Sequence, residues 1–156
     1  MASNDLSTPP IAVDTNALLD RGQRYCATAE HCPADVEQLF LRLGATREQT
    51  DEVIGILLQQ DYLNPARYCR AFVHDKVAFQ SWGRAKVLMG LRAKHLPEAD
   101  IRDALCGIDE TVYATNIRKL LRAKRGLEKP KIIRFMLQRG YTFDDLRRYA
   151  DYETDD

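Results

Sequence analysis

The sequence lacks any apolar run approaching the ~20 residues that a membrane-spanning helix requires, and its polar N-terminal segment has no apolar stretch of signal-peptide type. Its cysteines, Cys26, Cys32, Cys69 and Cys106, show no paired C-x-x-C spacing. Although Cys26 and Cys32 lie near His31, structural zinc requires four ligands at tighter spacings. These absences predict a cytoplasmic protein with reduced cysteines and no bound metal.

Catalytic motifs are also absent from the sequence. There is no glycine-rich phosphate loop, no H-E-x-x-H and no G-x-S-x-G motif. The adjacent residues His74 and Asp75 would point in different directions from a helix. Acidic pairs such as Asp144-Asp145 are expected in first turns or on polar faces, where the helix dipole and solvent favour carboxylates. The sequence therefore predicts a protein that is not an enzyme and binds no cofactor.

The formal net charge of zero hides an uneven distribution of charge along the chain. Residues 1–65 carry 4 Lys/Arg against 10 Asp/Glu, residues 66–139 carry 17 against 7, and residues 140–156 carry 2 against 6. A basic middle between acidic ends indicates a surface for a polyanion or an acidic partner. A set of well-solvated helix faces would give the same composition.

Helix start and stop signals recur along the chain, and almost nothing suits a strand. Thr15 or Asn16 is expected to cap the first helix, and Pro33 occupies a first helical position. Gly44 is expected to end that second helix, and Thr46-Arg-Glu-Gln49 fits a capping box that opens a third. Further helices are expected from Pro65, Trp82, Pro97, Asp109, Pro130 and Thr142.

The signals fall into three rounds that align without gaps when the chain is shifted by about 51 and then 45 residues. The shift aligns Val36 with Val87 and Ile132, and it aligns the turn residues Gly44, His95 and Gly140. We therefore predict an all-α fold of three tandem three-helix repeats, about nine helices, in an elongated, curved array stabilised by stacking between neighbours. The expected parts are a flexible leader (1–13), modules over 14–63, 64–107 and 108–152, and an acidic tail (153–156).

Basic side chains gather on the predicted second and third modules. Arg118, Arg122 and Arg125 follow i, i+4 and i+7 spacing opposite an apolar face, and Lys131 and Arg134 form a shorter row on the next helix. Most aromatic rings of this region are expected in the core (Phe72, Phe79, Tyr113), with Trp82 exposed at a helix start. The candidate partner- or DNA-binding residues are Arg70, Lys76, Trp82, Arg84, Lys86, Arg92, Lys94, Arg118, Arg122, Arg125, Lys131 and Arg134.

The middle of the chain resembles the signature of the RecX family of recombination regulators. The matching segments are Phe72-Val73, Trp82-Gly-Arg-Ala-Lys-Val87, Leu91-Arg-Ala-Lys-His-Leu96 and Ile101-Arg-Asp-Ala-Leu105. The segment from Arg139-Gly-Tyr141 to Leu146 is similar to the closing module of that family, so the resemblance spans about residues 15–150. The chain departs from the family pattern at Trp82, Gly90 and His95, where Lys, Glu and Gly are usual.

The resemblance implies three tandem three-helix modules and a monomer that binds RecA and the groove of its single-stranded-DNA filament. The implied effects are blocked filament extension, faster disassembly, and inhibition of RecA ATPase, strand exchange and coprotease activities. Such a protein regulates homologous recombination, DNA repair and the SOS response. Two alternatives remain open: a helical-repeat protein that binds nucleic acid directly, and a helical adaptor with another protein partner.

Overall fold

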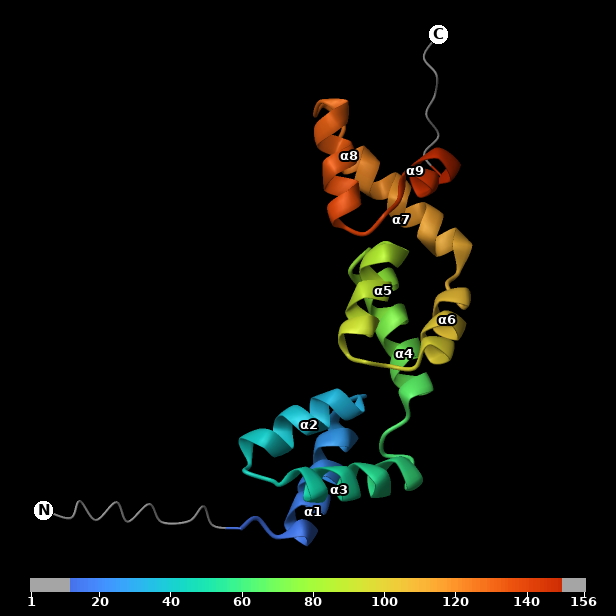
Figure 1. Cartoon of the computed structure of the whole chain (residues 1–156). Helices are drawn as coiled ribbons and strands as arrows, with labels where there is room; N and C mark the ends of the chain where they lie inside the picture. The colour runs from blue at the N-terminus through green and yellow to red at the C-terminus, as the bar shows by residue number, and fades with distance from the viewer. Residues whose placement is uncertain (1–11, 150–156) are drawn as a thin grey trace, which may run out of the picture. The chain divides into compact units, whose positions relative to one another are not determined.

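The computed structural model describes residues 12–149, and this part of the chain contains nine α-helices and one π-helical turn but no strand (Figure 1). The predicted all-α class is therefore confirmed. The predicted acidic tail and residues 1–11 of the predicted leader lie outside the described residues. Between residues 12 and 149, no helix is both long and apolar enough to cross a membrane.

The chain forms two compact units that divide between Asn64 and Pro65. The first contains α1 (Thr15–Thr28), α2 (Pro33–Arg42) and α3 (Arg47–Gln59). The second contains α4 (Pro65–His74), the π-helical turn η1 (Asp75–Phe79), α5 (Arg84–Ala93), α6 (Glu98–Cys106), α7 (Glu110–Ala123), α8 (Lys129–Gln138) and α9 (Phe143–Tyr149). The boundaries of three separate modules and the curvature of the array remain predictions.

Capping explains where the helices of the first unit begin. Pro33 opens α2 as predicted, and Thr46 and Gln49 form the predicted capping box at α3, with hydrogen bonds of 3.0 and 3.1 Å. The prediction for α1 was wrong: the cap is Asp14, whose carboxylate accepts the N–H of Asn16 at 3.3 Å. Because Asp is a stronger N-cap than Thr, the helix starts at Thr15 and not after it.

The core of the first unit lies between α1, α2 and α3. Leu18, Phe40 and Leu57 are at most 1% exposed, and they pack with Val36 and Val53. Such side chains contribute about 1.5–3 kcal/mol each when they are fully buried.

Several helices end in residues with positive φ. Gly44, Gly126 and Gly140 have φ of 81°, 101° and 96°, and His95 has φ of 56°. The predicted stop at Gly44 and the predicted turn at Gly140 are therefore confirmed, and His95 takes the left-handed conformation of the glycines with which it aligns. A non-glycine residue is uncommon in this region, although histidine is among those that tolerate it.

The π-helical turn η1 continues α4 and is attached to α7. The N–H of Gln80 donates to the carbonyl of Asp75 at 3.3 Å, which is the i to i+5 pattern of a π-helix. The side-chain amide of Asn116 on α7 donates to the carbonyl of Val77 at 2.7 Å, and Asn116 is buried. A buried amide with a partner is favourable, whereas an unpaired one is costly, so this bond ties α7 to η1.

Candidate partner-binding surface

The start of α5 packs directly on the turn between α8 and α9. The N–H of Gly83 donates to the carbonyl of Arg139 at 2.8 Å, and the N–H of Ala85 donates to the carbonyl of Gly140 at 3.0 Å. The buried hydroxyl of Tyr141 donates to the carbonyl of Ser81 at 2.7 Å. Burial raises the pKa of Tyr141 to about 12, so its hydroxyl stays a neutral donor at physiological pH.

Arg84, a candidate binding residue, belongs to this internal junction. Its guanidinium lies 4.0 Å from the centre of the Tyr113 ring, pairs with Glu110, and comes within 3.9 Å of Asp145. The Tyr113 hydroxyl accepts the N–H of Arg84 at 3.0 Å and donates to Asp145 at 2.9 Å, and Tyr149 donates to Glu110. The Arg84 side chain is only 29% exposed, so it mainly connects α5 to α7 and α9.

Sequence reasoning missed the partners of Arg84. Asp145 lies in the first turn of α9 as expected, but its side chain is only 13% exposed, and it accepts both the Tyr113 hydroxyl and the N–H of Thr142. Burial raises the pKa of Tyr113, so the neutral phenol is the form that donates to the Asp145 carboxylate. The only local signal was the Thr142-x-x-Asp145 spacing, which is typical of a capped helix start.

Three other candidate residues come together. The ammonium group of Lys76 lies 4.8 Å from the centroid of the Trp82 indole, and that of Lys86 lies 4.2 Å from it. Trp82 is half-buried, whereas the sequence predicted exposure. The Phe72 ring meets the indole edge-on, with centroids 6.3 Å apart. We name Lys76, Trp82 and Lys86 the Trp82 cluster.

A second group of candidate residues lies exposed on α7, α8 and the turn between them. We name Arg118, Arg122, Arg125, Lys131 and Arg134 the basic row. The prediction that Arg125 continues the α7 stripe was wrong, because α7 ends at Ala123 and the turn at Gly126 follows. Lys124, which caps the end of α7, places its ammonium group 4.3 Å from the Phe135 ring of α8.

The remaining candidates lie outside both groups. Arg92 donates two hydrogen bonds to Glu98, at 2.9 and 3.3 Å. The bond raises the pKa of Arg92 and lowers that of Glu98. Lys94 is half-buried at the C-cap of α5. Arg70 is exposed on α4, at the edge of a pocket.

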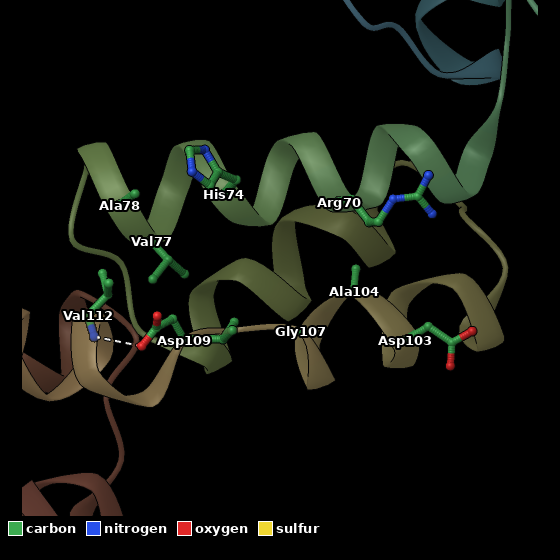
Figure 2. A pocket seen from close by; sticks show the side chains of 10 residues that line it. Arg70, His74, Val77, Ala78, Asp103, Ala104, Gly107, Asp109 and Val112 are labelled. Atoms are coloured by element: carbon green, nitrogen blue, oxygen red, sulfur yellow. Dashed lines mark hydrogen bonds between the residues drawn. The ribbon is translucent and has the colours of Figure 1, made fainter.

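This pocket has a volume of about 520 Å³ and lies between α4, η1, α6 and the start of α7. Figure 2 shows Arg70 and His74 on the α4 side, with Asp103 and Asp109 across from them. Asp109 accepts the N–H groups of Thr111 and Val112 at 2.8 and 3.2 Å. Its carboxylate is therefore already used as the N-cap of α7.

Two further predictions concern buried rings and thiols. Tyr113 is buried as predicted, but Phe79 was expected in the core and is 75% exposed. Cys32 and Cys69 are buried, Cys26 is half-buried and Cys106 is exposed. Within residues 12–149, no three His, Cys, Asp or Glu side chains gather in a way that could hold a metal ion.

The fold defines a helical-repeat protein of the all-α class whose exposed basic residues lie mainly on its second unit. Residues 65–105 match the family described as RecX, second three-helix domain. The chain is 29% identical over 146 residues to the regulatory protein RecX of Pseudomonas savastanoi pv. phaseolicola, covering 89% of this chain and 94% of that protein. It is 24% identical to the RecX of Vibrio parahaemolyticus, covering 81% and 85%.

Solved structures share the fold. A crystal structure of regulatory protein RecX superposes with a TM-score of 0.77 at 18% identity, over 88% of this chain and 73% of that one. The RecX of Lactobacillus salivarius superposes with a TM-score of 0.73 at 17% identity, over 86% and 93%. The family model and the relatives together indicate the RecX family of regulatory proteins.

Proposed function

We propose that this chain regulates RecA by binding to RecA and its filament on single-stranded DNA. Similarity to regulatory proteins of the RecX family supports this partner. Binding would occupy the filament groove, block extension, and inhibit RecA ATPase, strand exchange and coprotease activities. The chain would thereby act in recombination, DNA repair and the SOS response through non-covalent contacts alone.

The observation that carries the proposal is the basic row. Its five side chains are exposed, and within residues 12–149 no ion pair joins Arg122, Arg125, Lys131 or Arg134 to a carboxylate. Exposed charges of this kind change stability by less than ~0.5 kcal/mol when they are replaced. Binding is the role that their charge can serve, because a filament of DNA and protein presents phosphates and acidic side chains.

The test is RecA ATPase on single-stranded DNA, measured with and without this protein. We expect ATP hydrolysis and strand exchange to fall as the protein is added, up to equimolar amounts. Unchanged RecA activity at a large excess of the protein would refute the proposal. A gel-shift measurement on the same DNA without RecA would distinguish filament binding from direct binding to nucleic acid.

A further inference from the structure

We propose that the Trp82 cluster binds two successive phosphates of one nucleic-acid strand, and that the indole holds the two ammonium groups in place without stacking on a base. The inference rests on the proposed function, because it assigns to the cluster a contact with the DNA of the filament. It concerns residues of η1, of α5 and of the segment between them, apart from the basic row of α7 and α8.

The geometry places both cations on the π-face of one ring. Lys76 reaches the indole from η1, with its ammonium group also 5.4 Å from the Phe72 centroid, and Lys86 reaches it from the first turn of α5. A cation within ~6 Å of a ring centroid is attracted by the negative face of the ring. The indole therefore holds both ammonium groups, and a base could stack at either position only by displacing the ammonium group that lies there.

The backbone around the indole fixes its position. The N–H of Trp82 donates to the carbonyl of Lys76 at 2.9 Å, so the indole and one of its cations share a hydrogen-bonded turn. A Cβ atom built on Gly90 would lie 2.9 Å from Cζ of Phe72. The absence of a side chain at Gly90 therefore lets Phe72 pack on α5 and support the edge of Trp82.

The charges around the indole leave the cluster positive. Asp75 lies 3.6 Å from the ammonium group of Lys76, but no ion pair holds Lys86 within residues 12–149. Arg139 adds a third cation nearby, and its guanidinium donates to the carbonyls of Gln80 and Ser81, which precede Trp82. An ammonium group resting on an aromatic ring keeps N–H donors for an anion.

Phosphates are suitable ligands for these two cations. Lysine is a common phosphate ligand and binds the phosphate as a point charge, so it needs no fixed bidentate geometry. Phosphates of one strand recur every ~3.4 Å along a duplex axis and lie further apart on an extended strand. Because both ammonium groups lie within 5 Å of one ring centroid, they are close enough together to contact neighbouring phosphates.

The experiment uses Trp82 as its own probe, because it is the only tryptophan in the chain. Its fluorescence is titrated with an oligothymidine, without RecA, over a range of salt concentrations. We expect wild-type binding to weaken with salt, and the double variant Lys76→Gln, Lys86→Gln to lower the log–log salt slope by about 1.4, or ~0.7 for each phosphate. Arg24→Gln, Arg47→Gln, two cations at least 70% exposed in the first unit, is the matched control and should keep the wild-type slope.

Ring variants test the role of the indole, with a labelled oligothymidine as the reporter. Trp82→Phe should retain most of the binding, and Trp82→Leu should lose several-fold in affinity. If Trp82→Leu does not fold, the lysine variant decides, because it leaves the ring in place.

Four results would overturn the inference. The first two are a lysine double variant that keeps the wild-type salt slope, or one that binds DNA more tightly than wild type. The third is a Trp82→Leu variant that folds and binds like wild type, and the fourth is polyglutamate that competes for the protein as well as DNA does. The third result would show that DNA binding does not require the ring, and the fourth would show that the cluster binds carboxylates as well as phosphates. Absence of wild-type binding to bare DNA would also overturn it, while inhibition of RecA ATPase would still support the proposed function.

Discussion

The backbones of Gly83 and Gly140 lie so close together that a Cβ atom built on Gly83 would sit 2.2 Å from the carbonyl carbon of Gly140. A Cβ atom built on Gly140 would in turn sit 2.3 Å from Cβ of Lys86. Gly83 has an ordinary φ of −80°, so only the lack of space for a Cβ atom requires glycine at this position. At Gly140 the positive φ favours glycine as well. The contact between α5 and the α8–α9 turn therefore depends on glycine at both positions.

The first prediction concerns this contact. We expect Gly83→Ala to lower the free energy of unfolding by about 1–3 kcal/mol, because the added methyl group must displace backbone atoms. The matched control is Gly55→Ala inside α3, where nothing lies within 4 Å of the added Cβ. This control should stabilise the protein by about 0.5–1 kcal/mol through helix propensity. Thermal melting of both variants checks the prediction, and equal melting temperatures would contradict it.

The second prediction concerns His95, whose φ is 56°. We expect His95→Gly to stabilise the protein by about 1 kcal/mol, because glycine adopts the left-handed conformation without the steric cost that a Cβ atom adds. Gly44→Ala, at an equivalent helix end with φ of 81°, should destabilise it by a similar amount. Chemical denaturation measures both changes. A destabilised His95→Gly variant would show that the imidazole makes a contact worth more than the strain.

Many of the helix boundaries could be predicted from the sequence, because the signals that start and end a helix are local. The capping box of Thr46 and Gln49 and the stop at Gly44 each depend on a few adjacent residues. The burial of Asp145 and the pairing of Arg84 could not be predicted, since both depend on helices that meet only in the folded second unit. Phe79 was misplaced because the π-helical turn breaks the α-helical spacing that would align it with Phe72.

The third prediction concerns the basic row and rests on the proposed function. We expect the charge reversal Arg118→Glu, Arg122→Glu to melt normally and to lose most inhibition of RecA ATPase, because both side chains are exposed on α7. The matched control reverses two exposed arginines of the first unit, Arg21→Glu and Arg42→Glu, and should still inhibit. Full inhibition by the α7 variant would show that the row is only a solvated face, and a collapsed melting temperature would show a structural role.

The fourth prediction concerns the thiols. In the native protein a small disulfide reagent should modify Cys106 first, because it is exposed, and should reach Cys32 and Cys69 only after unfolding, since both are 0% exposed. Cys106→Ser should remove the fast phase of the reaction. Elemental analysis should find no stoichiometric zinc, and a zinc ion per chain would refute the expectation of a metal-free protein.

The fifth prediction concerns high pH. An unfolded tyrosine ionises near ~10, whereas burial raises the pKa of Tyr141 to about 12. The unfolded chain therefore releases this proton first, so the stability contributed by Tyr141 is complete below pH ~10 and is lost as the pH rises through the folded pKa.

The variant Tyr141→Phe tests this. It should unfold about 1 kcal/mol more easily at pH 7, because the hydrogen bond to Ser81 is lost. It should also lose less stability than wild type between pH 10 and 12, as measured by denaturant titration at each pH. An identical pH dependence in the two proteins would contradict the assignment.

Because of the π-helical turn at Asp75–Phe79, the geometry of the Trp82 cluster depends on the number of residues in η1 as well as on their types. A π-helical turn accommodates one residue more than an α-helical turn closed by the same kind of bond. Deleting a single residue there would let the Val77 carbonyl rejoin an α-helical ladder, and Asn116 would lose its acceptor. Lys76 would then face another direction relative to Trp82. A one-residue deletion that retains every charged residue would therefore move Lys76 away from Lys86.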